Sequence, residues 1–536
     1  LESSTGDFER VQIALRETFD LYGLSCHPSV LQLIQPALRE GDWQVTVAVH
    51  QSERIVAVWP GYKDQAFGLA VDIGSTTIAG HLCDLGSGEV VASAGMMNPQ
   101  IRFGEDLMSR VSYLLMKPDG REEMTQVVRA AVNQLITETV AAVDSDASHV
   151  LELSIAGNPI MHHLFLGLSP VELGTAPFAL VTDAAIGQDA ASLDLRTNPG
   201  AQVYVLPCIA GHVGADAAAM VLAEAPQTQA GVALVVDVGT NAEIVLSNNG
   251  KLLACSSPTG PAFEGAQISC GQRAAPGAIE RVRIDAETFE PKFKVIGSDL
   301  WSDEPGFEAV VAKIGVSGIC GSGIIEVIAE MYLAGVVDED GVMDGSLAER
   351  SPRVIPDDRT FSYQLWHGER AIVISQNDVR QVQLAKAALY AGIKLLLSRE
   401  GIETVDQVRL AGAFGAHIDT TYAMVLGLIP DCHLAQVSSA GNAAGTGARI
   451  ALLNVSARRE IEALVQRITK IETALEPGFQ DFFVDAMAFP NKRDQFPLLF
   501  EQLARPRPSS ASAKRGERGS RRRGRGTKSA VLTDAG

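Results

Sequence analysis

The chain has 536 residues, 46% apolar and 20% charged, which is typical of a folded protein with about three or four structural units. The net charge of −20 is unevenly distributed. Residues 1–504 carry 34 positive and 62 negative charges, whereas residues 505–528 carry ten positive charges and one negative charge. So acidic a body argues against a nucleic-acid-binding protein, and the longest uncharged stretches are broken by polar and turn residues, which argues against a membrane span.

The seven cysteines are widely spaced along the chain. They are Cys26, Cys83, Cys208, Cys255, Cys270, Cys320 and Cys432. No CxxC pair and no ferredoxin-like spacing occurs among them, so we expect no disulfide framework, no zinc site and no iron–sulfur cluster held by this chain. Unpaired cysteines also favour a reducing compartment, and we therefore expect a cytoplasmic protein.

Residues 1–66 are predicted to form a small N-terminal α+β domain. A helical pattern runs from about Phe8 to Tyr22, and two strand-like runs follow at Gln44–Val49 and Arg54–Val58. The dipeptide Pro60-Gly61 is typical of a turn and ends the domain.

An internal repeat predicts the fold of the following residues. The sequence LAVDIGSTT at Leu69–Thr77 recurs 165 residues later as LVVDVGTNA at Leu234–Ala242. Each copy is an apolar strand that ends in Asp, a turn of Gly and hydroxyl residues, and a second strand. We expect a duplicated ATP-binding α/β fold with lobe I at 67–230 and lobe II, with closing C-terminal helices, at 231–500. The Arg, Ser and Gly content beyond residue 500 predicts a disordered basic tail at 501–536.

The Asp-x-Gly-hydroxyl pattern suits phosphate binding. Glycine lets the backbone approach phosphate oxygens, the N–H groups of its neighbours form a positive concavity, and an Asp can hold a hydrated Mg²⁺ ion. In the first copy, Ser75, Thr76 and Thr77 add hydroxyl donors. One copy alone is more often an ordinary turn. Two copies, each between strands, favour a nucleotide site.

Two glycine-rich turns are candidates for an adenosine pocket. Gly315–Gly323 leads into the apolar helix pattern Ile324–Ile328, and Val408–Gly415 is a strand followed by a turn. Close backbone packing at the start of a helix explains either turn alone equally well. Their position after the second Asp hairpin favours the adenosine pocket. No P-loop and no dinucleotide-binding fingerprint competes with this interpretation.

Seven sequence blocks, in the same order along the chain, resemble the reductive activators of corrinoid enzymes. The blocks are Val71–Thr77, Ala156–Pro159, Val213–Asp216, Gly260–Gly265, Gly318–Gly323, Gln383–Ala388 and Phe482–Met487. The paired hairpins and the small-residue helix Gly441–Ala448 also resemble the wider superfamily of acetate and sugar kinases, heat-shock chaperones and actin. The resemblance covers about residues 1–495. It implies two actin-like, ribonuclease H-like ATPase lobes.

The resemblance also implies a function. These activators use ATP to drive an uphill one-electron transfer from a 2Fe-2S cluster to the cobalt(II) of a partner corrinoid protein or cobalamin-dependent methyltransferase, which returns it to cobalt(I). The family resemblance further implies a homodimer. The family holds its cluster in an N-terminal ferredoxin domain, and this chain starts at Leu1 without the required cysteines. We therefore expect that domain to be missing by truncation.

Roles for individual residues are carried over from the resemblance by matching position. Asp72 and Asp237 would serve Mg²⁺ and the hydrolytic water, and Glu243 or Asp216 would polarise that water. Glu243 is otherwise a solvent-facing strand residue, and Asp216 is otherwise a helix cap. The phosphates would be held by Gly74, Ser75, Thr76, Thr77, Gly239, Thr240 and Asn241. The adenosine would be held by Gly318, Gly321, Ser322, Gly323, Gly412 and Ala413, the last of which replaces a glycine that is usual in the superfamily.

Two other functions remain open from the sequence. A small-molecule kinase of the same superfamily would need a polar acceptor pocket and a catalytic base. A non-enzymatic nucleotide switch, in the manner of the chaperones, would need neither.

Overall fold

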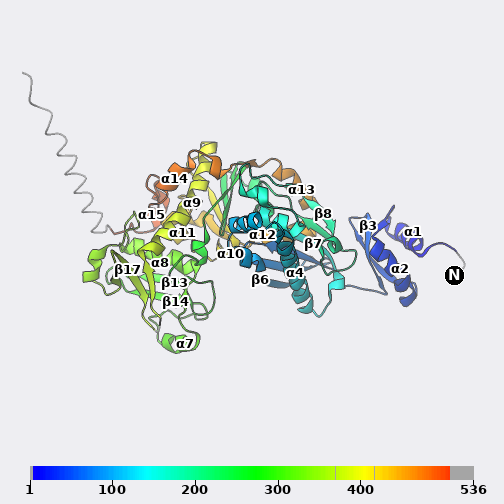
Figure 1. Cartoon of the computed structure of the whole chain (residues 1–536), viewed down its shortest axis with the longest axis horizontal. Helices are drawn as coiled ribbons and strands as arrows, with labels where there is room; N and C mark the ends of the chain where they lie inside the picture. Colours follow the sequence, from blue (N-terminus) through cyan, green and yellow to red (C-terminus); the bar gives the residue numbers. More distant parts are fainter. Residues whose placement is uncertain (1–3, 369, 416, 508–536) are drawn as a thin grey trace, which may run out of the picture. The chain divides into compact units, whose positions relative to one another are not determined.

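The computed structural model describes residues 4–368, 370–415 and 417–507 (Figure 1). Contacts between residues divide the chain into two units. The first comprises Leu1–Ala225 and Asn442–Lys470, and the second comprises Pro226–Gly441 and Ile471–Gly536. None of the helices within the described ranges is both long enough and apolar enough to cross a lipid bilayer.

The N-terminal part of the first unit is an α+β domain, as predicted. Its elements are α1 (Asp7–Phe19), β1 (Ser25–Cys26), α2 (Pro28–Glu40), β2 (Val45–His50) and β3 (Arg54–Pro60). The three strands form one sheet in the order β1-β3-β2. Helix α2 was not predicted, because Pro36 in its interior is a residue that normally ends a helix. His27 caps its first turn by accepting from Ser29 N, and Pro28 occupies the favourable first position.

The rest of the first unit is built on a six-stranded sheet with the order β6-β5-β4-β7-β9-β8. The strands are β4 (Phe67–Ile73), β5 (Thr77–Asp84), β6 (Val90–Met97), β7 (Val150–Gly157), β8 (Ile186–Asp189) and β9 (Gln202–Val205). The central strand β4 is antiparallel to β5 and parallel to β7. The helices are α3 (Leu107–Met116), α4 (Gly120–Ala141), α5 (Pro159–Leu166), α6 (Ala215–Glu224), α12 (Ala443–Leu453) and α13 (Val455–Val465).

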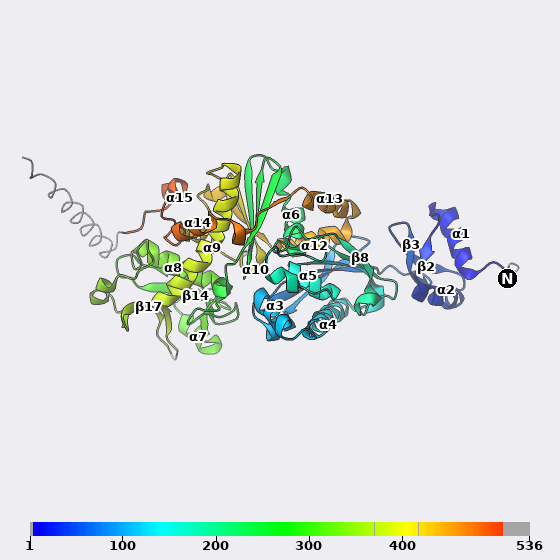
Figure 2. The same ribbon diagram turned by 45° about the horizontal axis from the view of Figure 1, so that its top comes forward.

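The two faces of β4 pack against different helices, of which α4, α6 and α12 are labelled in Figure 2. Leu69, Val71 and Ile73 belong to the hydrophobic cluster that includes α4, whereas Ala70 packs with α6 and α12. Side chains alternate between the faces of a strand, so Asp72 lies on the same face as Ala70. The last carboxylate of β4 is therefore placed on the side of α6 and α12.

The segment Asn442–Lys470 belongs to the first unit, although the preceding 216 residues belong to the second. Helix α12 packs closely on α6. The two backbones are so near that a Cβ atom added at Gly447 would lie only 1.9 Å from Ala219 O. The range 231–500 expected for lobe II therefore contains a piece of the first unit. The small residues of α12 make this close helix packing possible.

The second unit repeats the arrangement of the first. Strands run in the order β20-β19-β10-β11-β12, with β10 antiparallel to β11 and parallel to β19. They are β10 (Val232–Val238), β11 (Ala242–Asn248), β12 (Lys251–Ser257), β19 (Gln407–Ala411) and β20 (Val437–Gly441). The central hairpin and its parallel neighbour match β4, β5 and β7, which confirms the duplicated α/β fold predicted from the repeat.

Two small sheets and the remaining helices complete the second unit. The sheets are β14-β13-β15 and β16-β17-β18. Their strands are β13 (Ala278–Ile284), β14 (Pro291–Val295), β15 (Gly318–Ile319), β16 (Val354–Asp357), β17 (Thr360–Trp366) and β18 (Ile372–Ser375). The helices are α7 (Phe307–Ile314), α8 (Gly321–Ala334), α9 (Gln376–Glu400), α10 (Gly412–Gly415), α11 (Thr420–Leu426), α14 (Phe479–Asp485) and α15 (Pro497–Gln502).

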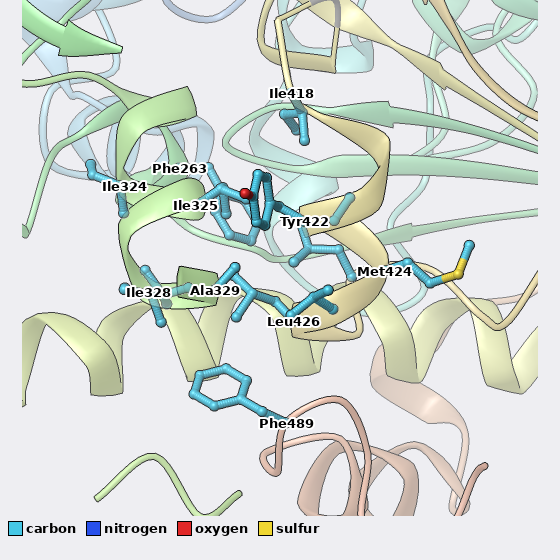
Figure 3. Packing of buried hydrophobic residues seen from close by; sticks show 14 of the residues in the cluster. Phe263, Ile324, Ile325, Ile328, Ala329, Ile418, Tyr422, Met424, Leu426 and Phe489 are labelled. Carbon is cyan, nitrogen blue, oxygen red and sulfur yellow. The ribbon is translucent and has the colours of Figure 1, made fainter. Parts of the chain in front are cut away.

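Helix α8 lies in the core of this unit. In Figure 3 its side chains Ile325 and Ile328 lie close to Tyr422 and Leu426 of α11 and to Phe489. All but one of its residues are buried, including Glu326 and Glu330, so the apolar helix pattern Ile324–Ile328 corresponds to a helix surrounded by protein.

The predicted disordered tail, 501–536, starts too early. Residues 501 and 502 are the end of α15, and Arg507 donates from Nη1 to Ala286 O at 2.9 Å. These contacts place 501–507 on the second unit. Residues 508–536 lie outside the described residues.

Candidate functional site

In the first unit, three polar side chains meet at the end of β4. Asp72 is paired in register with Ala79 of β5 and Ala156 of β7. Asn442, the N-cap of α12, hydrogen-bonds to the Asp72 carboxylate and accepts from Gly445 N through Oδ1 at 2.7 Å. Asp216 lies in the first turn of α6, near enough to Asp72 for its charge to act on it. The N-termini of α6 and α12 are thus both directed toward acidic groups.

Both carboxylates are strained electrostatically. The pKa of Asp72 is raised to about 7, mainly by burial and also by the negative charge of Asp216, whereas the hydrogen bond from Asn442 opposes both effects. Burial also raises the pKa of Asp216, although backbone N–H groups at the start of α6 oppose that increase. Two buried carboxylates close to one another are difficult to ionise at the same time, and a cation bound between them would stabilise their charged forms. Oxygen ligands of this kind fit Mg²⁺, which needs few protein ligands because it retains water.

The turn Gly74–Thr77 follows directly on Asp72. A Cβ atom at Gly74 would lie 2.7 Å from Thr77 O, so only glycine fits this tight turn. Asn98 binds the turn twice, from Nδ2 to Gly74 O and from its backbone N to Thr76 O, each at 2.8 Å. The guanidinium of Arg110 donates to Ser75 O. The predicted phosphate residues are therefore held from behind by two side chains that the sequence did not single out.

In the second unit, Asp237 and Gly412 come together. Asp237 is the last but one residue of β10, in register with Glu243 of β11 and Ala411 of β19. Gly412 has a φ of 86°, and a Cβ atom there would lie 2.2 Å from Asp237 Oδ1. Asp237, a predicted metal residue, and Gly412, a predicted adenosine residue, are therefore neighbours. The Asp237 carboxylate leaves no room for a side chain at position 412. Ala413 follows in α10.

The turn Gly239–Asn241 has its own supports. Thr259 donates from Oγ1 to Gly239 O at 2.8 Å and to Thr240 O at 2.9 Å. Thr240 Oγ1 donates to Glu264 Oε1 at 2.6 Å. Glu264 belongs to the sequence block Gly260–Gly265, but no role was predicted for it. Because the Thr240 hydroxyl donates its proton to Glu264, the Thr240 oxygen can act toward a further group only as a hydrogen-bond acceptor.

Glu243 is not a solvent-facing strand residue. Its side chain is only 9% exposed and lies opposite Ser256 of β12, which donates from Oγ to Glu243 Oε1 at 3.4 Å. Asp216 is not the N-cap residue of α6, which is Gly214, but it lies in the first turn and its Oδ1 accepts from Ala217 N at 2.8 Å. The choice between Glu243 and Asp216 as the group that polarises water stays a prediction.

The glycines of the first adenosine turn have clear structural reasons. A Cβ atom would lie 2.7 Å from Gln272 Oε1 at Gly318, and 2.4 Å from Ile279 O at Gly323. Both allow α8 and β15 to approach neighbouring backbone. Gly321 and Ser322 are buried in the first turn of α8. Backbone packing thus accounts for Gly318 and Gly323, and their contact with adenosine stays a prediction.

The cysteines do not form a cluster-binding site. All seven are free. Cys26, Cys83 and Cys255 lie on the separate strands β1, β5 and β12, and the other four lie between the named helices and strands. Within the described ranges, no three His, Cys, Asp or Glu side chains converge as metal ligands. The side chains described here therefore do not fit a 2Fe-2S cluster.

Comparisons with known proteins cover nearly the whole chain. Residues 1–65 match the RACo linker region, 67–228 the RACo middle region, and 231–500 the C-terminal domain of RACo, the ASKHA domain. The corrinoid activation enzyme RamQ of Eubacterium limosum is 34% identical over 459 residues, which are 83% of this chain and 74% of RamQ.

Two further relatives agree with this match. The Co(II) methylated amine-specific corrinoid protein reductase of Methanosarcina barkeri is 26% identical over 455 residues, 79% of this chain and 77% of the reductase. The solved structure of a reductive activator for corrinoid, iron-sulfur protein superposes with a TM-score of 0.80 at 30% identity, covering 92% of this chain and 77% of that one. The chain therefore belongs to the RACo family of enzymes, the reductive activators of corrinoid proteins.

Proposed function

We propose that this chain couples binding and hydrolysis of ATP to the one-electron reduction of cobalt(II) to cobalt(I) in a partner corrinoid protein. The observation that carries the proposal is the group of Asp72, Asp216 and Asn442 beside the Gly74–Thr77 turn. The chain belongs to a family of corrinoid activators with an ASKHA domain. Paired carboxylates suit Mg²⁺, and a turn rich in backbone N–H donors suits the phosphates of ATP.

Each predicted residue then has a binding role. Asp72 and Asp216 hold the metal ion through its water shell in the first unit, Asp237 serves metal and phosphate binding in the second unit, and Glu243 or Asp216 polarises the attacking water. When bound, Mg²⁺ offsets negative charge on the phosphate oxygens. The phosphates are bound by the turns Gly74–Thr77 and Gly239–Asn241. Adenosine is bound by Gly318, Gly321, Ser322, Gly323, Gly412 and Ala413.

The electron balance limits what this chain does. One electron leaves a low-potential donor and one arrives at cobalt(II), which becomes cobalt(I). The described side chains hold no site for a 2Fe-2S cluster, so the donor is a separate centre. ATP acts only through its different affinities for two conformations of the activator and its complex. The residues of this chain therefore supply the nucleotide-dependent change of conformation and the docking of the corrinoid partner.

The test uses a corrinoid protein loaded with cobalt(II), a chemical one-electron reductant, the chain and Mg·ATP. The cobalt(II) paramagnetic resonance signal should disappear and the cobalt(I) absorption spectrum should appear only when ATP is present. Asp72→Asn should abolish this dependence. Asp194→Asn, at a surface carboxylate paired with Arg129, is the matched control and should behave like the wild type.

Two outcomes would contradict the proposal. If ATP binds and the cobalt spectrum does not change, corrinoid reduction is wrong. If ADP is released together with a phosphorylated small molecule, the chain is a kinase. Size-exclusion chromatography with light scattering tests the homodimer that the proposal includes, and fractionation of cells tests the cytoplasmic location.

A further inference from the structure

Arg110 of α3 is a fully buried arginine without a carboxylate partner. Its relative exposure is 0%, and it has the largest volume of the fully buried side chains in the described part of the chain. No Asp or Glu among the described residues forms an ion pair with it. Asp106, whose charge acts on it, caps α3 instead by accepting from Ser109 N and Ser109 Oγ, each at 2.7 Å.

All acceptors of the Arg110 guanidinium are neutral. Nε donates to Gly104 O at 3.0 Å, Nη1 is 3.4 Å from Gln100 Oε1 and 3.3 Å from Met161 Sδ, and Nη2 donates to Ser75 O. Burial lowers the pKa of Arg110 to about 10, so the side chain remains charged at neutral pH. A buried cation that only neutral groups compensate is costly. An anion bound nearby would reduce this cost.

Arg110 and Asn98 bind successive carbonyl groups of the phosphate turn. Asn98, also fully buried, donates to Gly74 O, and Arg110 donates to Ser75 O. In a planar trans peptide, the C=O and the following N–H point in opposite directions. The N–H groups of Ser75 and Thr76 are therefore directed away from Asn98 and Arg110. These two side chains thus set the direction of two donors in the turn.

We propose that Arg110 is the positioning residue for the phosphates at this turn. It holds the Ser75 carbonyl so that the turn presents its N–H groups to the nucleotide, and its unpaired charge is complemented by the negative phosphates. The proposal rests on the function proposed above, since it requires that the turn binds ATP. It predicts that the contribution of Arg110 grows with the number of phosphates on the ligand.

Arg458 provides a matched control in the same unit. It is also buried, at 4% exposure, and it also donates to backbone carbonyls, those of Ala451 and Leu452. Unlike Arg110, it forms an ion pair with a carboxylate, Glu152, at 2.6 Å. Replacing it removes a buried arginine without changing the support of the turn.

The experiment measures the dissociation constants of ATP, ADP, AMP and adenosine, with Mg²⁺, by calorimetric titration of the full chain. Arg110→Met should weaken the binding of ATP about 10- to 100-fold, as expected for the loss of a hydrogen-bonding charged group. The binding of ADP and AMP should be weakened progressively less, and that of adenosine should not change. Arg110→Lys, which keeps the charge but not the planar fork, should lie between. Arg458→Met should lower the thermal midpoint of unfolding and leave all four constants unchanged.

The outcomes separate the possibilities. Wild-type affinity for ATP in Arg110→Met, or an equal loss for ATP and adenosine, would overturn the proposal, because the second result is what a purely structural residue would give. If Arg110→Met does not fold, Arg110→Lys decides: a loss graded by phosphate number supports the proposal and an ungraded profile overturns it. If the wild-type chain binds no ATP, the proposed function itself is wrong and this inference falls with it.

Discussion

The two Asp-Gly turns, one in each unit, have the same backbone design and different supports. In the first, the carbonyls of Gly74 and Ser75 are bound by the amide of Asn98 and the cation of Arg110. In the second, a single neutral hydroxyl, that of Thr259, binds two successive carbonyls. Duplication has therefore retained the turn while the charge behind it differs.

The carboxylates before the turns differ in the same sense. Asp72 lies near a second carboxylate, Asp216, and its pKa is raised by burial and by that charge. Asp237 packs instead against the open face of Gly412. We infer that the first unit is organised around charge, with a cation behind the turn and acids beside it, whereas the second is organised around close backbone approach. The following predictions test this difference.

The largest effect is expected for the charge centre. Asp72→Asn should lower ATP hydrolysis about 100-fold, because it removes the carboxylate that we propose holds the metal ion, a role worth several kcal/mol in transition-state stabilisation. Steady-state ATPase rates measure the effect. Asp194→Asn serves again as the control, and hydrolysis at the wild-type rate in Asp72→Asn would show that Asp72 does not serve the metal.

The matching change in the second unit should act through shape. Gly412→Ala should destabilise the chain by about 2 kcal/mol or more, since a Cβ at positive φ is strained and would also collide with Asp237. Gly401→Ala has a similar positive φ of 66° but no neighbouring atom within 4 Å, and should cost only about 1 kcal/mol. Urea unfolding of both variants measures the difference. An equal loss of stability in both variants would mean that Asp237 moves away from the new Cβ atom without a cost in free energy.

The third prediction concerns pH. The pKa of Asp72 is about 7 in the folded chain, above its ordinary value of 3.8, so the folded state binds more protons between these values. The free energy of unfolding without nucleotide should therefore fall as pH rises from about 4 to 7, and Mg²⁺ affinity should rise by up to about tenfold per pH unit over the same range.

Asp72→Asn is the control for this pH dependence. In that variant both slopes should become shallower, with a remainder from Asp216, whose pKa is raised as well. Chemical unfolding and metal titration at several pH values provide the measurements. Slopes identical to those of the wild type would assign the titration to another group.

The smallest effect is expected behind the second turn. Thr259→Val removes a neutral hydroxyl and should cost about 1 kcal/mol of stability, with ATP and ADP weakened by the same few-fold factor. Thermal unfolding and nucleotide titration measure both quantities. A loss graded by phosphate number, as expected for Arg110→Met, would contradict the distinction between the two turns.

The fold was predictable where the signals are local. Each copy of the Asp-Gly motif is contained in nine consecutive residues, and the structure confirms the two related α/β units that the motif predicts. The return of Asn442–Lys470 to the first unit was not predictable, since only the distant contact of Gly447 with α6 determines it. Helix α2 was missed because of Pro36, whose effect is overcome by packing of its neighbours Ile34 and Ala37 in the domain core.

The candidate site was predictable in its turns but not in its supports. Asp72, Gly74 and Ser75 belong to one motif, whereas Asn98 and Arg110 lie 24 and 35 residues from the carbonyls that they bind. An Arg in an amphipathic helix pattern is indistinguishable from a surface arginine. Its burial depends on long-range packing, and only the structure reveals that it lacks a carboxylate.

The path of the chain through the two units has a consequence for synthesis. Helix α12 packs on α6 and supplies Asn442 to Asp72, yet it lies more than 200 residues after α6 in the sequence. During translation the first unit therefore cannot complete its sheet cover or its acidic centre until the second unit has largely emerged from the ribosome. A nascent chain that stops before Asn442 lacks both α12 and the side chain that hydrogen-bonds to Asp72, so the proposed nucleotide site of the first unit is still incomplete at that stage.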